Sequence, residues 1–117
     1  MYENPSIVLS PSIPPDIADR LRPLGSLGVM KYKVDAGARV YVCSENDLID
    51  AAAINRLPDT LGLIAVAGMT THYIALETAR ARGIKVSNIP KHSRDIATSL
   101  KANITAFFDR GIPLNPV

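Results

Sequence analysis

The sequence predicts an α/β fold with a parallel sheet, from three observations. Short apolar segments alternate along the chain with segments whose apolar residues recur at helical spacing, which indicates strands joined by crossover helices. Residues 63–66 form a continuous apolar run, which is typical of a strand buried on both faces of a parallel sheet. Gly83 follows a helical pattern and directly precedes the next apolar run, where a helix end needs a residue that tolerates left-handed dihedral angles.

Length and composition limit the class of protein. A chain of 117 residues is predicted to form a single domain, residues 1–117, with its own core. The net charge of +2, the scattered basic residues and the small number of aromatic residues (four Tyr and two Phe) argue against nucleic-acid binding. The sequence shows no membrane-length apolar run and no signal-peptide pattern, and its single cysteine suits a reducing compartment. We therefore expect a soluble, cytoplasmic protein that binds neither nucleic acid nor membrane.

The sequence of the first third of the chain indicates two strands and one helix. Residues 6–10 form an apolar first strand, and the prolines within residues 11–15 indicate a rigid turn. Pro15 is placed to begin a helix that ends at Gly25. Residues 29–34 alternate between apolar and polar, so they predict a half-exposed second strand at a sheet edge, where its lysines discourage edge-to-edge pairing.

The remaining elements follow in regular order. Asp47 or Asp50 is expected to cap a helix after the third strand. Ser93 is the expected N-cap of a long amphipathic helix that Gly111 ends, before an extended tail. The further strands are predicted at residues 38–43, 63–67 and 84–89, with a helix at about 72–82.

Five strands separated by helical patterns predict a flavodoxin-like five-stranded parallel sheet of order 2-1-3-4-5, with helices on both faces. One link conflicts with this topology. Only residues 35–37 separate the second predicted strand from the third, whereas a parallel crossover needs about a dozen residues or more. We therefore expect the second strand to be short or shifted.

Polar residues gather at the carboxyl ends of the two central strands, where open α/β sheets bind ligands. The loop after Ser44 and the loop at residues 68–71 are expected to meet there. Their backbone N–H groups and the hydroxyls of Ser44, Thr70 and Thr71 could hold a small carboxylate. The alternative is that these residues only cap helices. His72, at the start of the predicted helix, is a further candidate, and the simpler interpretation is a polar residue in a first helical turn.

Recognised cofactor and metal patterns do not occur. The glycines do not form G-x-G-x-x-G, there is no Walker pattern, and Cys43 has no His or Cys at ligand spacing. Cys43 is expected to be a buried residue at the end of a strand. His92, beside Lys91 and Arg94, is expected to lie in a solvated basic linker.

Two segments resemble the D-isomer-specific 2-hydroxyacid dehydrogenases. Residues 63–90, LIAVAGMTTHYIALETARARGIKVSNIP, are similar to the family pattern L-I-A-x-A-G-x-G-x-D-x-I-D-L-x-A-A-x-x-R-G-I-x-V-x-N-x-P. Residues 103–117, NITAFFDRGIPLNPV, are similar to the family's final N-I-x-A-F-x-x-G-x-P-x-N-x-V. The resemblance implies a flavodoxin-like substrate-binding domain. The substrate-binding residues that it suggests, together with the loop argument above, are Ser44, Gly68, Met69, Thr70, Thr71 and His72.

The resemblance also assigns roles within the loop and marks departures. In the family, backbone N–H groups of this loop hold the substrate carboxylate, which corresponds to Met69 and Thr70 here. Thr70 stands where the family has Gly, and His72 and Ala75 stand where it has Asp. The β-branched Thr70 restricts a backbone that Gly leaves open.

The family inserts a Rossmann NAD-binding domain between the conserved proline and the C-terminal helix, whereas Pro90 and Asn103 lie close together here. The resemblance therefore implies that the inserted domain is replaced by a joint at about residues 90–100. NAD, the cofactor of the parent family, would have no site in this chain. No catalytic residue carries over, because His92 is too close to Asn103 to align with the family's histidine. We expect an isolated domain, engineered rather than natural, that is inactive as a dehydrogenase.

Two alternatives remain open: a small 2-oxoacid- or carboxylate-binding or regulatory module, and an FMN-binding relative of flavodoxin. The expected ligand is a small 2-oxoacid or 2-hydroxyacid. The expected oligomeric state is a monomer or a weak or domain-swapped homodimer, because the family dimerises mainly through the absent domain and the last helix could exchange between chains.

Overall fold

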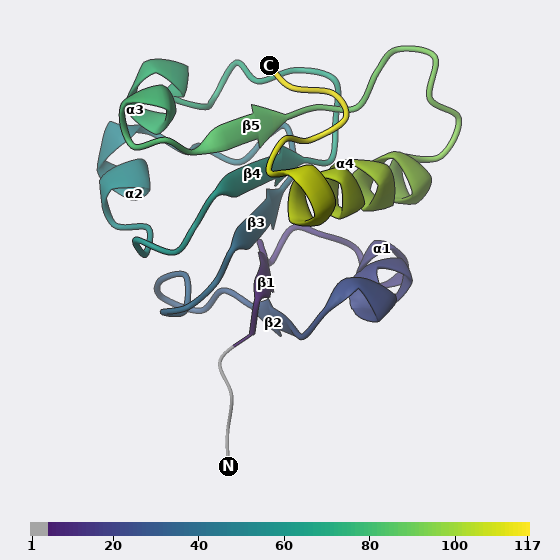
Figure 1. Ribbon diagram of the computed structural model, residues 1–117, viewed down its shortest axis with the longest axis horizontal. Coiled ribbons are helices and arrows are strands. Elements are labelled where there is room, and N and C mark those ends of the chain that lie inside the picture. Colours follow the sequence, from purple (N-terminus) through teal and green to yellow (C-terminus); the bar gives the residue numbers. More distant parts are fainter. Residues whose placement is uncertain (1–4) are drawn as a thin grey trace.

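The computed structural model describes residues 5–117, which form a five-stranded sheet of order β2-β1-β3-β4-β5 with every pair of neighbouring strands parallel (Figure 1). The predicted fold class and strand order are confirmed. The strands are β1 (Ile7–Leu9), β2 (Leu27–Val29), β3 (Val40–Cys43), β4 (Leu63–Val66) and β5 (Lys85–Ser87).

Helices cover both faces of the sheet (Figure 1). The long helix α4 (Ile96–Arg110) and the short helix α1 (Pro15–Leu21), which continues into the 3₁₀ turn η1 (Arg22–Leu24), lie on one face. Helices α2 (Ala51–Asn55) and α3 (Leu76–Ala81) lie on the other. The structure therefore has three layers, with one apolar core on each side of the sheet.

The two cores explain the unbroken apolar run in the sequence. Successive strand residues point to opposite faces, so Leu63 packs in the core under α1 and α4, whereas Ile64 packs in the core under α2 and α3. All four residues of β3 and all four of β4 are buried. A strand buried on both faces has no polar side to alternate with.

The second strand is shorter than predicted and lies further upstream, as the short link to the third strand required. It spans Leu27–Val29, and residues 30–34 are irregular. The apolar and polar alternation of residues 29–34 therefore does not mark a strand. Met30 and Val34 do pack against the core under α2 and α3, but Tyr32 between them is 98% exposed. The shift leaves residues 30–39 to cross from β2 past β1 to β3.

Helix boundaries also differ from the predictions at two places. Helix α3 begins at Leu76 rather than near residue 72. Before it, the Ile49 N–H donates to Tyr73 O (2.8 Å) and the Ala75 N–H donates to Ile49 O (2.9 Å), so this backbone pairs with a distant residue instead of forming a helical turn. Helix α4 begins after Asp95, and the Asp95 side chain caps it. The predicted cap at Ser93 is therefore wrong.

Other local predictions are confirmed. Asp50 caps α2 by accepting from the Ala53 N–H at 2.8 Å, and Pro15 occupies the first position of α1. Gly83 and Gly111 end their helices with φ of +74° and +79°. These are left-handed values that glycine adopts without a Cβ clash.

The C-terminal tail covers the outer edge of β5. The Val117 N–H donates to Val86 O (2.8 Å) and the Asn88 N–H donates to Asn115 O (3.3 Å). Asn103 of α4, fully buried, fixes this arrangement, since its amide donates to Asn88 O (3.2 Å) and accepts from the Asn115 N–H (2.7 Å). Pairing satisfies backbone groups that an open sheet edge would leave free. Over residues 5–117, no helix is long and apolar enough to cross a membrane.

Candidate functional site

The candidate site lies where β3 and β4 end. The Ala67 N–H donates to Cys43 O at 2.7 Å, which carries the strand pairing one residue beyond β4. The loop that starts at Ser44 and the loop at residues 68–71 therefore leave the sheet side by side, as expected from the sequence.

A carboxylate of the chain itself lies against the second loop. Glu45 Oε2 accepts from the backbone N–H of Met69 (3.1 Å) and from that of Thr70 (3.3 Å). Gly68 makes room for it, because a Cβ at this position would lie 2.5 Å from Glu45 Oε2 and 2.8 Å from Glu45 Cβ. Sequence reasoning missed Glu45, and its place directly after Ser44 at a strand end was the one available signal.

The loop is held in place from the β5 side. The Ile89 N–H donates to Gly68 O (2.8 Å), and the Asn88 side-chain amide donates to Met69 O (2.9 Å). These bonds hold the two carbonyl groups, and the N–H groups of Met69 and Thr70 remain available to Glu45. Two adjacent N–H groups that converge on one oxygen form an anion-binding arrangement.

Ser44 caps no helix, since Asp50 caps α2, and its hydrogen bonds lie within the turn that follows β3. Its N–H donates to Asp47 Oδ2 (2.9 Å), and its hydroxyl accepts from the Asn46 N–H (3.2 Å). Burial raises the pKa of Asp47, but hydrogen bonds from the Ser44 N–H and from the hydroxyls of Ser10, Ser12 and Ser44 outweigh burial and bring that pKa below its ordinary value.

His72 does not lie at a helix N-terminus. It is exposed in a turn four positions before α3 begins, so the predicted placement is wrong. Thr70 and Thr71 are half-buried in the loop, and the Met69 side chain is 51% exposed. The part of this loop that contacts Glu45 is its backbone.

The turn after β1 lies at the reversal of strand order, where flavodoxin-like folds hold FMN. A phosphate there would need free backbone donors, and Pro11 and Pro14 supply none. The nearby donors already serve a carboxylate, since the Ser12 hydroxyl (2.8 Å) and the Ser44 N–H (2.9 Å) both donate to Asp47. These residues do not fit a flavin phosphate.

Cys43 is fully buried at the end of β3, as predicted. Burial raises the pKa of its thiol to about 12, so the nucleophilic thiolate is scarce at neutral pH. Burial likewise raises the pKa of Tyr41 to about 12. Among the described residues, no group of three or more His, Cys, Asp or Glu side chains is placed to hold a metal ion.

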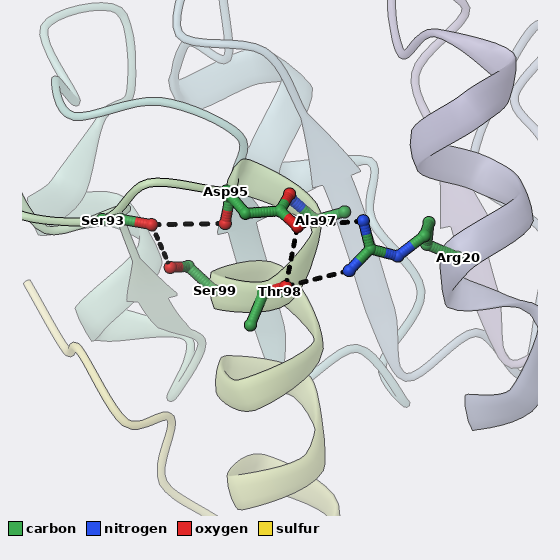
Figure 2. A network of polar contacts seen from close by, with 6 residues as sticks. All are labelled: Arg20, Ser93, Asp95, Ala97, Thr98 and Ser99. Atoms are coloured by element: carbon green, nitrogen blue, oxygen red, sulfur yellow. Dashed lines mark hydrogen bonds and ion pairs between the residues drawn. The ribbon is translucent and has the colours of Figure 1, made fainter.

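The segment from β5 to α4 contains a polar network (Figure 2). Asp95 accepts from the Ala97 N–H (3.1 Å) and from the Thr98 hydroxyl (2.9 Å). Arg20 of α1 donates to Asp95 (3.0 Å) and to Thr98 (2.9 Å), while Ser93 bonds with the Asp95 carbonyl and with Ser99. The hydrogen bonds from Thr98 and from Arg20 lower the pKa of Asp95. His92 and Lys91 are exposed beside this network, as expected for a basic linker.

The fold is that of a flavodoxin-like α/β domain, and the loop at the end of β4 directs two backbone N–H groups at the Glu45 carboxylate. The family model for the D-isomer specific 2-hydroxyacid dehydrogenase catalytic domain matches residues 31–101. The chain therefore belongs to this family, and the predicted resemblance is confirmed.

Solved structures agree with this assignment. The TT0316 protein from Thermus thermophilus is 27% identical, with a TM-score of 0.56 over 73% of this chain and 30% of that chain. A putative D-isomer specific 2-hydroxyacid dehydrogenase from Polaromonas sp. JS6 66 is 25% identical, with a TM-score of 0.63 over 76% and 31%. A 2-hydroxyacid dehydrogenase from Ketogulonicigenium vulgare Y25 shares the fold at 21% identity, with a TM-score of 0.63 over 77% and 31%. The chain thus spans about a third of the length of these relatives. No curated protein matched the sequence.

Proposed function

We propose that this chain is a substrate-binding domain of the 2-hydroxyacid dehydrogenase type, and that its loop at residues 68–71 binds the carboxylate of a small 2-oxoacid or 2-hydroxyacid. One observation carries the proposal. The N–H groups of Met69 and Thr70 already bind a carboxylate, that of Glu45, at 3.1 and 3.3 Å. A ligand carboxylate has the same chemistry and needs the same donors.

The departure at Thr70 does not weaken this proposal. Over residues 5–117 no residue other than glycine has a positive φ. Thr70 therefore presents its N–H from an ordinary backbone conformation, and the glycine of the family pattern is not needed for that purpose. A relative of the same fold, the D-lactate dehydrogenase from Aquifex aeolicus, was solved with NAD and lactic acid, a small 2-hydroxyacid.

We further propose that a joint at about residues 90–100 stands in place of the inserted NAD-binding domain, and that this chain does not transfer hydride by itself. Two features support this. The segment runs directly from β5 into a capped α4 that Arg20 ties to α1. The turn after β1 does not fit the phosphates of a dinucleotide, because it is rich in proline, which supplies no backbone N–H donor. In such enzymes the protein positions the substrate against the cofactor, so binding is expected here without turnover.

The test is a titration of the ¹⁵N-labelled chain with glyoxylate, followed at the backbone amides. We expect saturable shifts centred on Met69 and Thr70, and no NADH oxidation when NADH is added. The Thr70→Pro variant removes one N–H donor and should weaken binding by about tenfold. Thr70→Ala keeps the donor and serves as the matched control. Glyoxylate shifts that spare Met69 and Thr70, or equal loss of binding in both variants, would contradict the binding site. Steady NADH oxidation would contradict the absence of hydride transfer.

A further inference from the structure

We infer that Glu45 is an internal ligand that closes the carboxylate site, so that an external carboxylate binds only by displacing it. The inference rests on the proposed function, since it concerns the same two N–H groups. It adds a residue and a regulatory step that the family resemblance does not contain.

The two donors cannot serve two carboxylates at once. Each backbone N–H has a single hydrogen to donate, and Glu45 Oε2 already accepts from both Met69 and Thr70. A second carboxylate brought close to Glu45 would also meet like charge. Binding of Glu45 and binding of an external acid are therefore mutually exclusive.

Glu45 is held near the site by its backbone but not by a cation. The turn that carries it is fixed on both sides, by the bond from the Ser44 N–H to Asp47 and by the bond from the Asn46 N–H to Ser44 Oγ. Within the described part of the chain, Glu45 forms no ion pair. Its side chain can thus leave by rotation about its own bonds, without breaking an ion pair or moving a strand.

Gly68 shapes the position of Glu45. A Cβ at residue 68 would lie within 2.8 Å of three Glu45 atoms, namely Oε2, Cδ and Cβ. The glutamate side chain therefore lies directly on the glycine backbone, where any other residue would push it away. This close fit indicates a specific position for the Glu45 side chain rather than a chance surface contact.

Closure by Glu45 sets the apparent affinity for an external acid. When only a fraction of the molecules has the site open, the apparent dissociation constant rises by the inverse of that fraction. A site that is open in about a tenth of the molecules would bind about tenfold more weakly than the same site without Glu45.

The experiment compares glyoxylate dissociation constants for the wild-type chain and for Glu45→Ala, read from the Met69 and Thr70 amide shifts. We expect Glu45→Ala to bind about tenfold more tightly or better. Glu45→Gln should lie in between, because its amide oxygen still accepts but carries no charge. The control is Glu77→Ala, an exposed glutamate on α3, which should bind as the wild type does.

The outcomes separate this inference from the proposed function. Equal dissociation constants in the wild type, Glu45→Ala and Glu45→Gln, with shifts at Met69 and Thr70, would overturn the role of Glu45 and leave the proposed site standing. The absence of binding in all of these variants would overturn both. If Glu45→Ala does not fold, the Gln variant gives the same comparison with a side chain of the same size.

Discussion

Two carboxylates in this molecule accept backbone N–H groups with nearly the same geometry, but their surroundings differ. Asp95 accepts from the Ala97 N–H at 3.1 Å, two residues away, and an arginine neutralises it (Figure 2). Glu45 accepts from the Met69 N–H at the same distance, across 24 residues, and forms no ion pair within the described residues. The first contact caps the start of α4, and the Asp95 side chain also ties α4 to Arg20 of α1. The second fills a loop that could otherwise bind a ligand.

Asp95 caps the start of α4, whereas Glu45 caps no helix and contacts only the loop after β4. The free energy of unfolding is therefore expected to depend on the α4 side of the molecule and not on the Glu45 loop.

The largest decrease in the free energy of unfolding is expected from Asn103→Ala in α4. The side chain is fully buried and links Asn88 O to the Asn115 N–H, so its removal leaves two backbone groups without partners. Unsatisfied buried groups of this kind cost about 1–3 kcal/mol. Urea unfolding should show this loss as a lower midpoint with an unchanged slope. A midpoint within error of the wild type would contradict the role given to Asn103.

A smaller decrease in the free energy of unfolding is expected from Asp95→Ala, which removes the cap of α4 and the ion-pair partner of Arg20. Replacing a capping residue by alanine weakens a helix start, so the melting temperature should fall by a few degrees. Asp95→Asn keeps a side-chain acceptor and should recover most of the loss. Equal melting temperatures for the Ala and Asn variants would show that the cap contributes nothing measurable.

The same residue predicts a dependence on pH. The pKa of Asp95 is lowered in the folded chain from its ordinary value of 3.8. The contribution of Asp95 to the free energy of unfolding is therefore fully present above its pKa in the unfolded chain. This contribution is lost as the pH falls through its lower pKa in the folded chain. Between pH 7 and pH 3 the wild type should lose more stability than Asp95→Asn. Parallel stability curves for the two proteins would contradict the assignment.

The smallest effect on stability is expected from Glu45→Ala. Its side chain is only half-buried and caps no helix, and substitutions at such sites usually change stability by no more than about 0.5 kcal/mol. Thermal unfolding of this variant beside Asp95→Ala tests the comparison directly. A larger loss for Glu45→Ala than for Asp95→Ala would make Glu45 a structural residue.

Most of the fold was predictable because it depends on local patterns. Apolar runs marked β3 and β4, and glycines with left-handed dihedral angles ended α3 and α4. Errors arose where a distant contact decided the backbone. The residues before Leu76 looked helical, but they pair with Ile49.

The position of the candidate site in the fold was predicted from the sequence, but the contacts within it were not. The position of the loop at residues 68–71 follows from strand order, which the sequence pattern predicts. The contact of Glu45 with Met69 joins residues far apart in the chain, and no motif marks it. The Thr70 and His72 side chains were reasonable candidates by residue type, whereas the contact that the structure describes is made by backbone N–H groups.

The central claim is that the N–H groups of Met69 and Thr70 form a carboxylate site that Glu45 closes. Its most direct test is the dissociation constant of glyoxylate, measured at these two amides in the wild type and in Glu45→Ala. We expect binding in both, about tenfold tighter or better in the variant. Equal affinities, or no response of these amides in either protein, would contradict it.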